Sequence, residues 1–161
     1  MTDAIQAERI TATIKWPTDV LVGDRRVASA ATSSAASDGP VDYVNLNVDR
    51  ATLRTALGAS ASGATSLSEV AGRPIDRNAF AARFLNFLER WIDTYRADGP
   101  EAVVAAWRER DGLRGRFVEV RDEETSSRGI ARGVSDDGAL LLEDAQQRVN
   151  AIATGEVILG G

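Results

Sequence analysis

The chain of 161 residues is long enough for one domain of ordinary size, or for one domain with a small appendage. It contains no cysteine and no histidine, which excludes disulfide bonds, catalysis by a thiolate or an imidazole, and metal sites built from these ligands. The net charge of −5 argues against binding to nucleic acid, and no stretch approaches the roughly 20 apolar residues of a membrane span, so we expect a cytoplasmic protein.

The first predicted strand leads into Lys15, the one lysine of the chain. Residues 10–14 alternate β-branched and small side chains, a pattern typical of a strand. Pro17 has no N–H group, so the strand should bend there and leave Lys15 at a rim, with Trp16 shaping the bend. Because every other basic residue is arginine, the compact ammonium of Lys15 is the first candidate for catalysis. The alternative is that compositional drift left a single lysine.

A β-hairpin is predicted next, with strands over residues 20–22 and 26–28 and a turn at residues 23–24. Residues 29–40 are small and polar and predict a weak strand at best, or otherwise a loop. We interpret Asp19 as a structural residue that accepts backbone N–H bonds in the turn before this hairpin.

A second alternating run covers residues 41–48 and places Tyr43, Asn45 and Asn47 on one face. Amide side chains on one face of a strand are either solvated or line a polar pocket. The run of small residues at 55–66 predicts a surface connection.

Two helices are predicted in the middle of the chain. Asp76 should cap the first helix, in which apolar residues recur at steps of three and four and predict a core-facing stripe. The residues of this stripe are Phe80, Phe84, Phe87, Leu88, Trp91 and Tyr95. Gly99 ends this helix and Pro100 begins another, which reaches Trp107 and ends before Gly112.

After residue 112 the pattern changes from helical to alternating. Five short β runs follow within about 48 residues, a density typical of a small closed barrel. They cover residues 117–120, 129–134, 139–142, 149–153 and 157–159. We therefore expect an α+β part over residues 1–112 and a β-barrel over residues 113–161.

In this order, the features resemble biotin protein ligases. The motif Lys15-Trp16-Pro17, which we call the lysine motif, is similar to the second half of the catalytic domain, as are the hairpin, the strand with the amides and residues 64–67. The β runs are similar to the SH3-like C-terminal domain. The resemblance implies an α+β fold: a truncated mixed sheet with packed helices, as in the second half of the class II synthetase-like core, followed by a small SH3-like β-barrel.

Such ligases join biotin to ATP with release of pyrophosphate, and then transfer the biotinyl group to a lysine of a biotin carboxyl carrier domain. The resemblance makes Lys15 the catalytic residue that contacts the biotin carboxylate. It places Asn47 near the ATP phosphates and Mg²⁺, although a solvated strand residue is the alternative. Ser29, Tyr43 and Asn45 stand where the family has glycine. Tyr43 and Asn45 would occupy the space where biotin lies, unless both side chains turn away. No residue of the chain is assigned as a metal ligand.

The glycine- and arginine-rich loop of the family lies upstream of the lysine motif, so we expect this chain to be truncated and impaired when alone. It would then need a second chain that supplies the missing half. The alternative is an inactive, ligase-derived binding module. The expected sheet edge leaves open whether the chain is a monomer or forms a homodimer.

Overall fold

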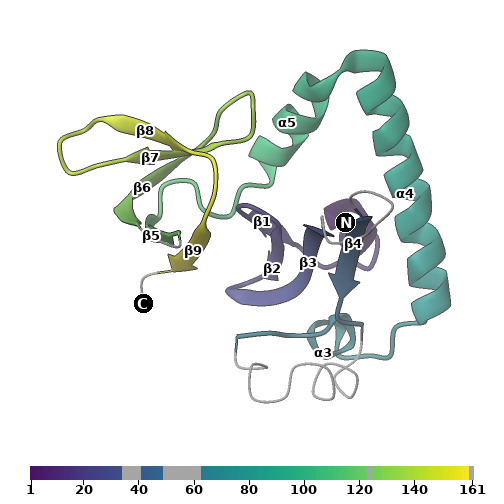
Figure 1. The fold of residues 1–161 in the computed structure, drawn as a ribbon. Helices are drawn as coiled ribbons and strands as arrows, with labels where there is room; N and C mark the ends of the chain where they lie inside the picture. Colours follow the sequence, from purple (N-terminus) through teal and green to yellow (C-terminus); the bar gives the residue numbers. More distant parts are fainter. Residues whose placement is uncertain (34–40, 49–62, 123–124, 160–161) are drawn as a thin grey trace. The chain divides into compact units, whose positions relative to one another are not determined.

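A computed structural model describes residues 1–33, 41–48, 63–122 and 125–159 (Figure 1). The chain divides into two compact units, each described by itself. Met1–Thr13 and Thr18–Arg90 form what we call the N-terminal unit, and Ile14–Pro17 and Trp91–Gly161 form the C-terminal unit. The domain boundary expected after residue 112 stays a prediction.

The first sheet has the strand order β1-β2-β3-β4. Its strands and the helices of this part of the chain are α1 (Thr2–Gln6), β1 (Thr13–Lys15), β2 (Asp19–Val22), β3 (Arg25–Ser33), β4 (Val41–Leu46), α3 (Leu67–Ala71) and α4 (Arg77–Asp98). The predicted hairpin is confirmed: β2 and β3 are antiparallel, and Gly23 in their turn has a φ of 59°. A positive φ of this size is accessible to glycine at little cost.

Of the predictions for the small, polar segments, one is confirmed in part and one needs correction. The strand alternative for residues 29–40 is present as far as Ser33, because the backbone of β3 pairs with β4 along its whole second half, up to Ser33 opposite Val41. The connection expected at the surface differs from the prediction: Thr65 and Ser66 are completely buried. The hydroxyl of Ser66 accepts a hydrogen bond from the backbone N–H of Glu69 and so caps α3. The rest of both segments, residues 34–40 and 55–62, lies outside the described part of the chain.

The core of the N-terminal unit forms between one face of the sheet and the helices. Its buried residues are Ala4, Ile5, Ile10, Val20, Val27, Ala28, Leu67 and Phe80. Asp76 caps α4 as predicted, since its Oδ1 accepts bonds from the backbone N–H groups of Asn78 and Ala79 at 2.9 and 3.0 Å.

The apolar stripe of α4 is core only over its first turns. Phe84 and Phe87 are half-buried and pack against the N-terminal core beside Phe80. Leu88 and Tyr95, by contrast, are 41% and 55% exposed. The helix is 22 residues long in total and ends at Asp98, well beyond Phe87, the last side chain that packs against this core. The prediction that the whole stripe is buried is therefore wrong for its C-terminal part.

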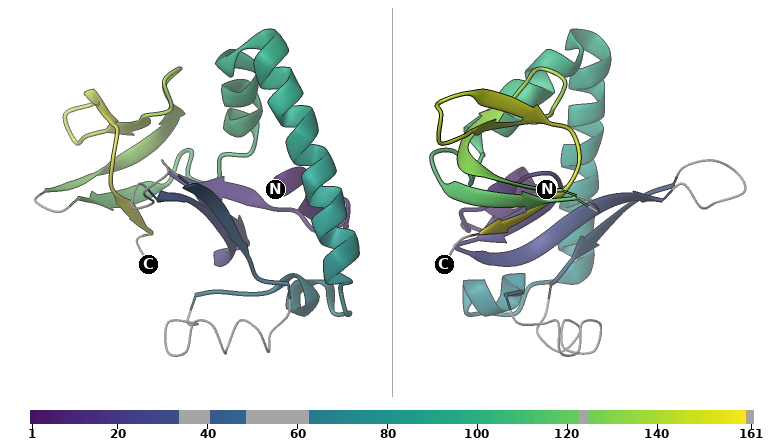
Figure 2. Two further views of the ribbon diagram at one scale, coloured as in Figure 1. Left: turned by 45° about the vertical axis from the view of Figure 1, so that its right-hand side comes forward. Right: turned by 60° about the vertical axis from the view of Figure 1, so that its left-hand side comes forward.

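All five strands predicted after residue 112 are present. The elements of this region are α5 (Pro100–Glu109), β5 (Phe117–Arg121), β6 (Ser126–Val134), β7 (Leu140–Glu143), β8 (Val149–Ile152) and β9 (Glu156–Leu159). They form one antiparallel sheet of order β8-β7-β6-β5-β9, which Figure 2 shows as strongly curled. Because this order has two ends, the predicted closed barrel is not confirmed.

One face of this sheet makes the core of the C-terminal unit. The burial of β5 alternates, with Val118 and Val120 inside, as expected for a strand with one packed face. The buried cluster consists of Trp16, Leu113, Val118, Val120, Ala131, Val134, Leu140, Leu142 and Val157. Trp16 is thus a core residue of this unit rather than only a residue that shapes a bend.

Within the described residues, no helix combines the length and the apolar character that crossing a bilayer requires.

Candidate functional site

Lys15 is the last residue of β1 and is half-buried. Its neighbours on both sides are fixed within the C-terminal unit. The N–H of Ile14 donates to the carbonyl of Arg110 at 2.7 Å, and the carbonyl of Ile14 accepts from the N–H of Gly112 at 2.8 Å. On the other side, Trp16 is 4% exposed, and its Nε1–H donates to the carbonyl of Gly138 at 3.0 Å. The backbone of Lys15 is therefore held between two anchors.

The segment that anchors Ile14 is itself well connected. Oδ1 of Asp111 accepts from the N–H of Leu113 at 2.8 Å, and Leu113 is completely buried. Just before this segment, Nε and Nη2 of Arg108 donate to the carbonyl of Val134 at 3.0 and 2.8 Å. Burial raises the pKa of the Asp111 carboxyl group, because removal of water penalises the charged form.

In the N-terminal unit, three polar residues form a row across β2, β3 and β4. Asp19 is paired with Ser29, and Ser29 with Asn45, in the register of the antiparallel strands. Directly paired residues share one face of a sheet. The sheet thus brings Ser29 and Asn45 together, as two of the candidate residues for ligand binding, and adds Asp19 to them.

The next row of paired residues shows on which face of the sheet the polar row lies. This next row consists of Val20, Ala28 and Leu46, each adjacent in sequence to a residue of the polar row, and all three belong to the buried core or pack against it. Because successive side chains of a strand point to opposite faces, the row of Asp19 lies on the face away from the core.

Sequence reasoning missed Asp19 as a member of the row. The pairing of β2 with β3 shifts by one residue between Val20 and Leu21. Without this bulge Asp19 would be paired with Ala28 instead of Ser29. A bulge at this place has no mark in the sequence.

The other two candidate residues are Tyr43, which lies within β4, and Asn47, which lies just after it. The backbone of Tyr43 is paired with Ala31. Asn47 follows the strand and is half-buried; its N–H donates to the carbonyl of Val27 and its carbonyl accepts from the N–H of Leu67, both at 2.9 Å. The backbone of Asn47 thus connects β3 to the start of α3.

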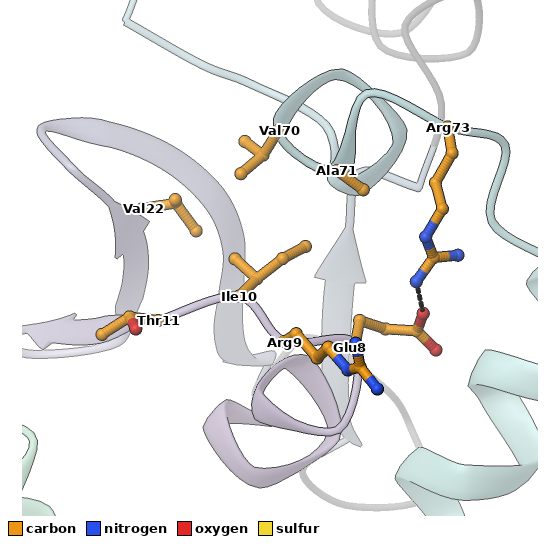
Figure 3. A pocket seen from close by; sticks show the side chains of 8 residues that line it. All are labelled: Glu8, Arg9, Ile10, Thr11, Val22, Val70, Ala71 and Arg73. Atoms are coloured by element: carbon orange, nitrogen blue, oxygen red, sulfur yellow. Dashed lines mark hydrogen bonds and ion pairs between the residues drawn. The ribbon is translucent and has the colours of Figure 1, made fainter.

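A cavity of about 780 Å³ lies elsewhere in the N-terminal unit (Figure 3). Figure 3 shows Glu8 and Arg73 joined on one side of it and the aliphatic side chains of Ile10, Val22 and Val70 further along. Oε2 of Glu8 lies 2.6 Å from Nη2 of Arg73, and its Oε1 bonds Arg83.

The role of Glu8 follows from these two arginines. Their hydrogen bonds and charges, above all those of Arg73, hold the pKa of Glu8 below its usual value. A carboxylate that is already paired twice serves the structure rather than proton transfer. None of the residues that the sequence predicts for catalysis or ligand binding lines this cavity.

The donors available at the candidate positions fit the ligands that the resemblance implies. An ammonium group, a hydroxyl and a carboxamide bind carboxylate and phosphate oxygens. In the described residues no three acidic side chains gather to hold a metal ion.

Known proteins resemble this chain over most of its length. Residues 115–160 match the family model described as the biotin protein ligase C terminal domain. The biotin--[acetyl-CoA-carboxylase] ligase of Paracoccus denitrificans is 33% identical over 156 residues, which cover 92% of this chain and 63% of that protein. The enzyme of the same name from Mycobacterium tuberculosis is 32% identical over 146 residues, covering 90% of this chain and 52% of that protein.

The fold agrees with these matches. The structure of a biotin protein ligase from Aquifex aeolicus in complex with biotin and ATP superposes with a TM-score of 0.85, covers 98% of this chain and 66% of that chain, and is 20% identical. The chain spans less than two thirds of the length of each of these proteins. The chain belongs to the biotin protein ligase family and corresponds to its C-terminal part.

Proposed function

We propose that this chain supplies the C-terminal part of a biotin protein ligase, which activates biotin with ATP and transfers it to a lysine of a biotin carboxyl carrier domain. The observation that carries the proposal is the placement of Lys15. It is the one lysine of the chain, and the residues on both sides of it are anchored by hydrogen bonds of 2.7 to 3.0 Å. An enzyme gains most from a charge whose position is fixed before the reaction begins.

In the proposed reaction, a carboxylate oxygen of biotin attacks the α-phosphorus of ATP and pyrophosphate leaves. The carrier lysine then attacks the carbonyl carbon of the mixed anhydride, and AMP leaves. Lys15 would contact and orient the carboxylate in the first step, and it would stabilise the negative charge that develops on the carbonyl oxygen in the second step. Bound ATP with Mg²⁺ supplies the activating group.

The polar row of the sheet would contribute to ligand binding. The hydroxyl of Ser29 and the amide of Asn45 can bind polar atoms of biotin or of the nucleotide, with Tyr43 further along the same strand. Asn47 would bind near the phosphates. Asp19 already forms an ion pair with Arg26, at 3.7 Å, so we assign it a supporting role.

We also propose that the C-terminal sheet is an SH3-like barrel and that the catalytic part extends to residue 112. The activity would further need the remaining part of the ligase fold, in the same or in a second polypeptide. The two ligases that this chain resembles in sequence are considerably longer than the chain, which supports this requirement.

The experiment mixes the chain with a polypeptide that carries the N-terminal part of the Paracoccus ligase, biotin, ATP-Mg²⁺ and a carrier domain. We expect biotinylated carrier, detected by mass spectrometry, and we expect Lys15→Ala to reduce the rate at least about 100-fold, as losses of a fixed charge-stabilising donor do. Arg96→Ala, which removes an exposed charge on α4, is the control.

Two results would contradict the proposal. One is a mixture that binds neither biotin nor ATP-Mg²⁺ in calorimetric titration and transfers no biotin. The other is a transfer rate that Lys15→Ala leaves unchanged.

A further inference from the structure

The lysine motif belongs to the C-terminal unit, although the rest of that unit is distant from the motif in sequence. Ile14–Pro17 group with Trp91–Gly161, although more than 70 residues lie between the two segments. A short segment that joins a distant unit is held by few contacts, and these contacts can be named individually.

The first anchor is the backbone of Ile14. It forms a parallel bridge with Asp111, and its N–H and carbonyl both bond the segment around that residue. This segment follows directly after α5. Near the C-terminal end of α5, Arg108 donates two hydrogen bonds to the carbonyl of Val134, at the end of β6.

The second anchor is the side chain of Trp16. The indole is buried in the core cluster of the C-terminal unit, and its N–H reaches the carbonyl of Gly138. Gly138 lies in the turn between β6 and β7. The turn is closed by bonds from the N–H of Gly138 to the carbonyl of Ser135, at 3.1 Å, and from the N–H of Ala139 to Oγ of Ser135, at 3.0 Å.

Both anchors therefore lead to one element, the hairpin that ends β6 and begins β7, residues 134–140. We infer that this hairpin positions Lys15, and that Trp16 is the positioning residue through which it acts. The catalytic meaning of this inference rests on the proposed function, whereas its structural content does not. Loosening the hairpin should displace Lys15 even though no residue of the hairpin is its neighbour in sequence.

The structural test uses the fact that the chain has one lysine. A sample labelled with ¹⁵N only in lysine gives one backbone amide signal, that of Lys15. We expect Ser135→Ala, which removes the acceptor for the Ala139 N–H, to move this signal by more than its line width. Ser66→Ala removes a similar acceptor in the N-terminal unit and should leave the signal in place.

A second pair of variants makes larger changes, so that the test does not depend on the size of the signal movement in Ser135→Ala. Val118 and Val27 are both completely buried, one in each core. Val118→Ala should move and broaden the Lys15 signal, and Val27→Ala should not. The inference is overturned when the N-terminal variants change the signal as much as the C-terminal variants do, or when none of the four changes it.

The kinetic test examines Trp16 in the complete ligase mixture. Trp16→Phe keeps an aromatic ring and removes the bond to Gly138, so we expect kcat to fall about fivefold to tenfold, the equivalent of one buried hydrogen bond, with KM for biotin within about twofold. Trp91→Phe makes the same change outside the buried clusters and should leave kcat unchanged.

A double variant separates positioning from a general loss of structure. If Trp16 acts through Lys15, then Trp16→Phe has no further effect in a Lys15→Ala background, because the two residues act as one unit. Additive losses would show that Trp16 acts by another route. If the mixture has no activity at all, the proposed function fails, and the lysine signal still decides the inference.

Discussion

Glu8 shows how a single carboxylate can tie the start of the chain to two later elements. It pairs with Arg73, which follows α3, and with Arg83 on α4, and its side chain is 11% exposed. Hydrogen bonds to charged groups contribute more than neutral ones, although solvent around the half-exposed arginines reduces the gain. The cavity of Figure 3 borders this pair, so its shape depends on the pair.

Glu8→Gln should therefore reduce the free energy of unfolding at pH 7 by about 1 kcal/mol. The folded-state pKa of Glu8 is lowered, so its contribution is present above the unfolded value of 4.5 and is lost as the pH falls through the folded value. Denaturant unfolding at pH 7 and at pH 3 measures the effect. A loss that is equally large at both pH values would contradict an ionic origin.

Asp111 should show the opposite pH dependence. Its folded-state pKa is raised, so its charged form is disfavoured by folding, and its contribution is lost as the pH rises from the unfolded value of 3.8 through the folded value. Asp111→Asn keeps an oxygen acceptor for the N–H of Leu113 and removes the charge. In this variant, denaturant unfolding between pH 3 and pH 7 should lack that decline, and a variant that retains the decline would refute the assignment.

Single residues could be predicted from the sequence where the cause is local. The cap formed by Asp76 depends on residues two and three positions away, and it is confirmed. The sequence around Asp19 and Trp16 indicates only a turn and a bend, whereas the partners of the two residues in the structure depend on a bulge and on a carbonyl 122 residues away. Local patterns contain no information on either.

At the scale of elements, the C-terminal sheet depends on close contact between β6 and β7. Gly129 in β6 is buried, and a Cβ atom placed on it would lie 2.2 Å from the carbonyl oxygen of Glu143 at the end of β7. Backbone cannot retreat there without breaking the pairing of the two strands.

Gly129→Ala should thus destabilise the C-terminal unit by more than about 2 kcal/mol, the range of overpacked sites. Ser127→Ala, at an exposed position of the same strand, is the matched control and should change stability by less than about 0.5 kcal/mol. Hydrogen exchange of the β5 to β7 amides measures both. Equal protection in the two variants would show that the strands can separate without cost.

Element type was predictable for the hairpin and for all five late strands, because their alternation or turn residues are strong. The second half of β3 and the burial of Thr65 could not be predicted firmly, since small polar residues show no periodic pattern of apolar side chains. What orders them is backbone pairing: the N–H of Thr65 donates to the carbonyl of Arg26 at 2.8 Å. Amino-acid composition does not predict backbone pairing of this kind.

At the scale of the whole molecule, the C-terminal unit is discontinuous in sequence. Trp16 is the largest side chain that the early segment contributes to its core. Trp16→Ala should accordingly destabilise this unit by about 3 to 5 kcal/mol, as the loss of a buried aromatic side chain does. Trp91→Ala, which removes a half-buried indole, should cost clearly less.

Hydrogen exchange locates this loss. Amides of β5 to β9 should lose protection in Trp16→Ala, while those of β3 and β4 change little. Uniform loss across both sheets would mean that the two units unfold together, so that the N-terminal and C-terminal units do not differ in their stability.

The bond between Trp16 and Gly138 also has a consequence for synthesis of the protein. A ribosome that has added Trp16 must add 122 further residues before the carbonyl that binds the indole exists. Until then, the nascent chain contains an early segment whose packing partners have not all been synthesised, and the formation of contacts over such a sequence separation is slow. A translation product that stops before the β6–β7 turn would contain Lys15 without the anchor that Trp16 provides, so the position of Lys15 is fixed only after this turn has been made.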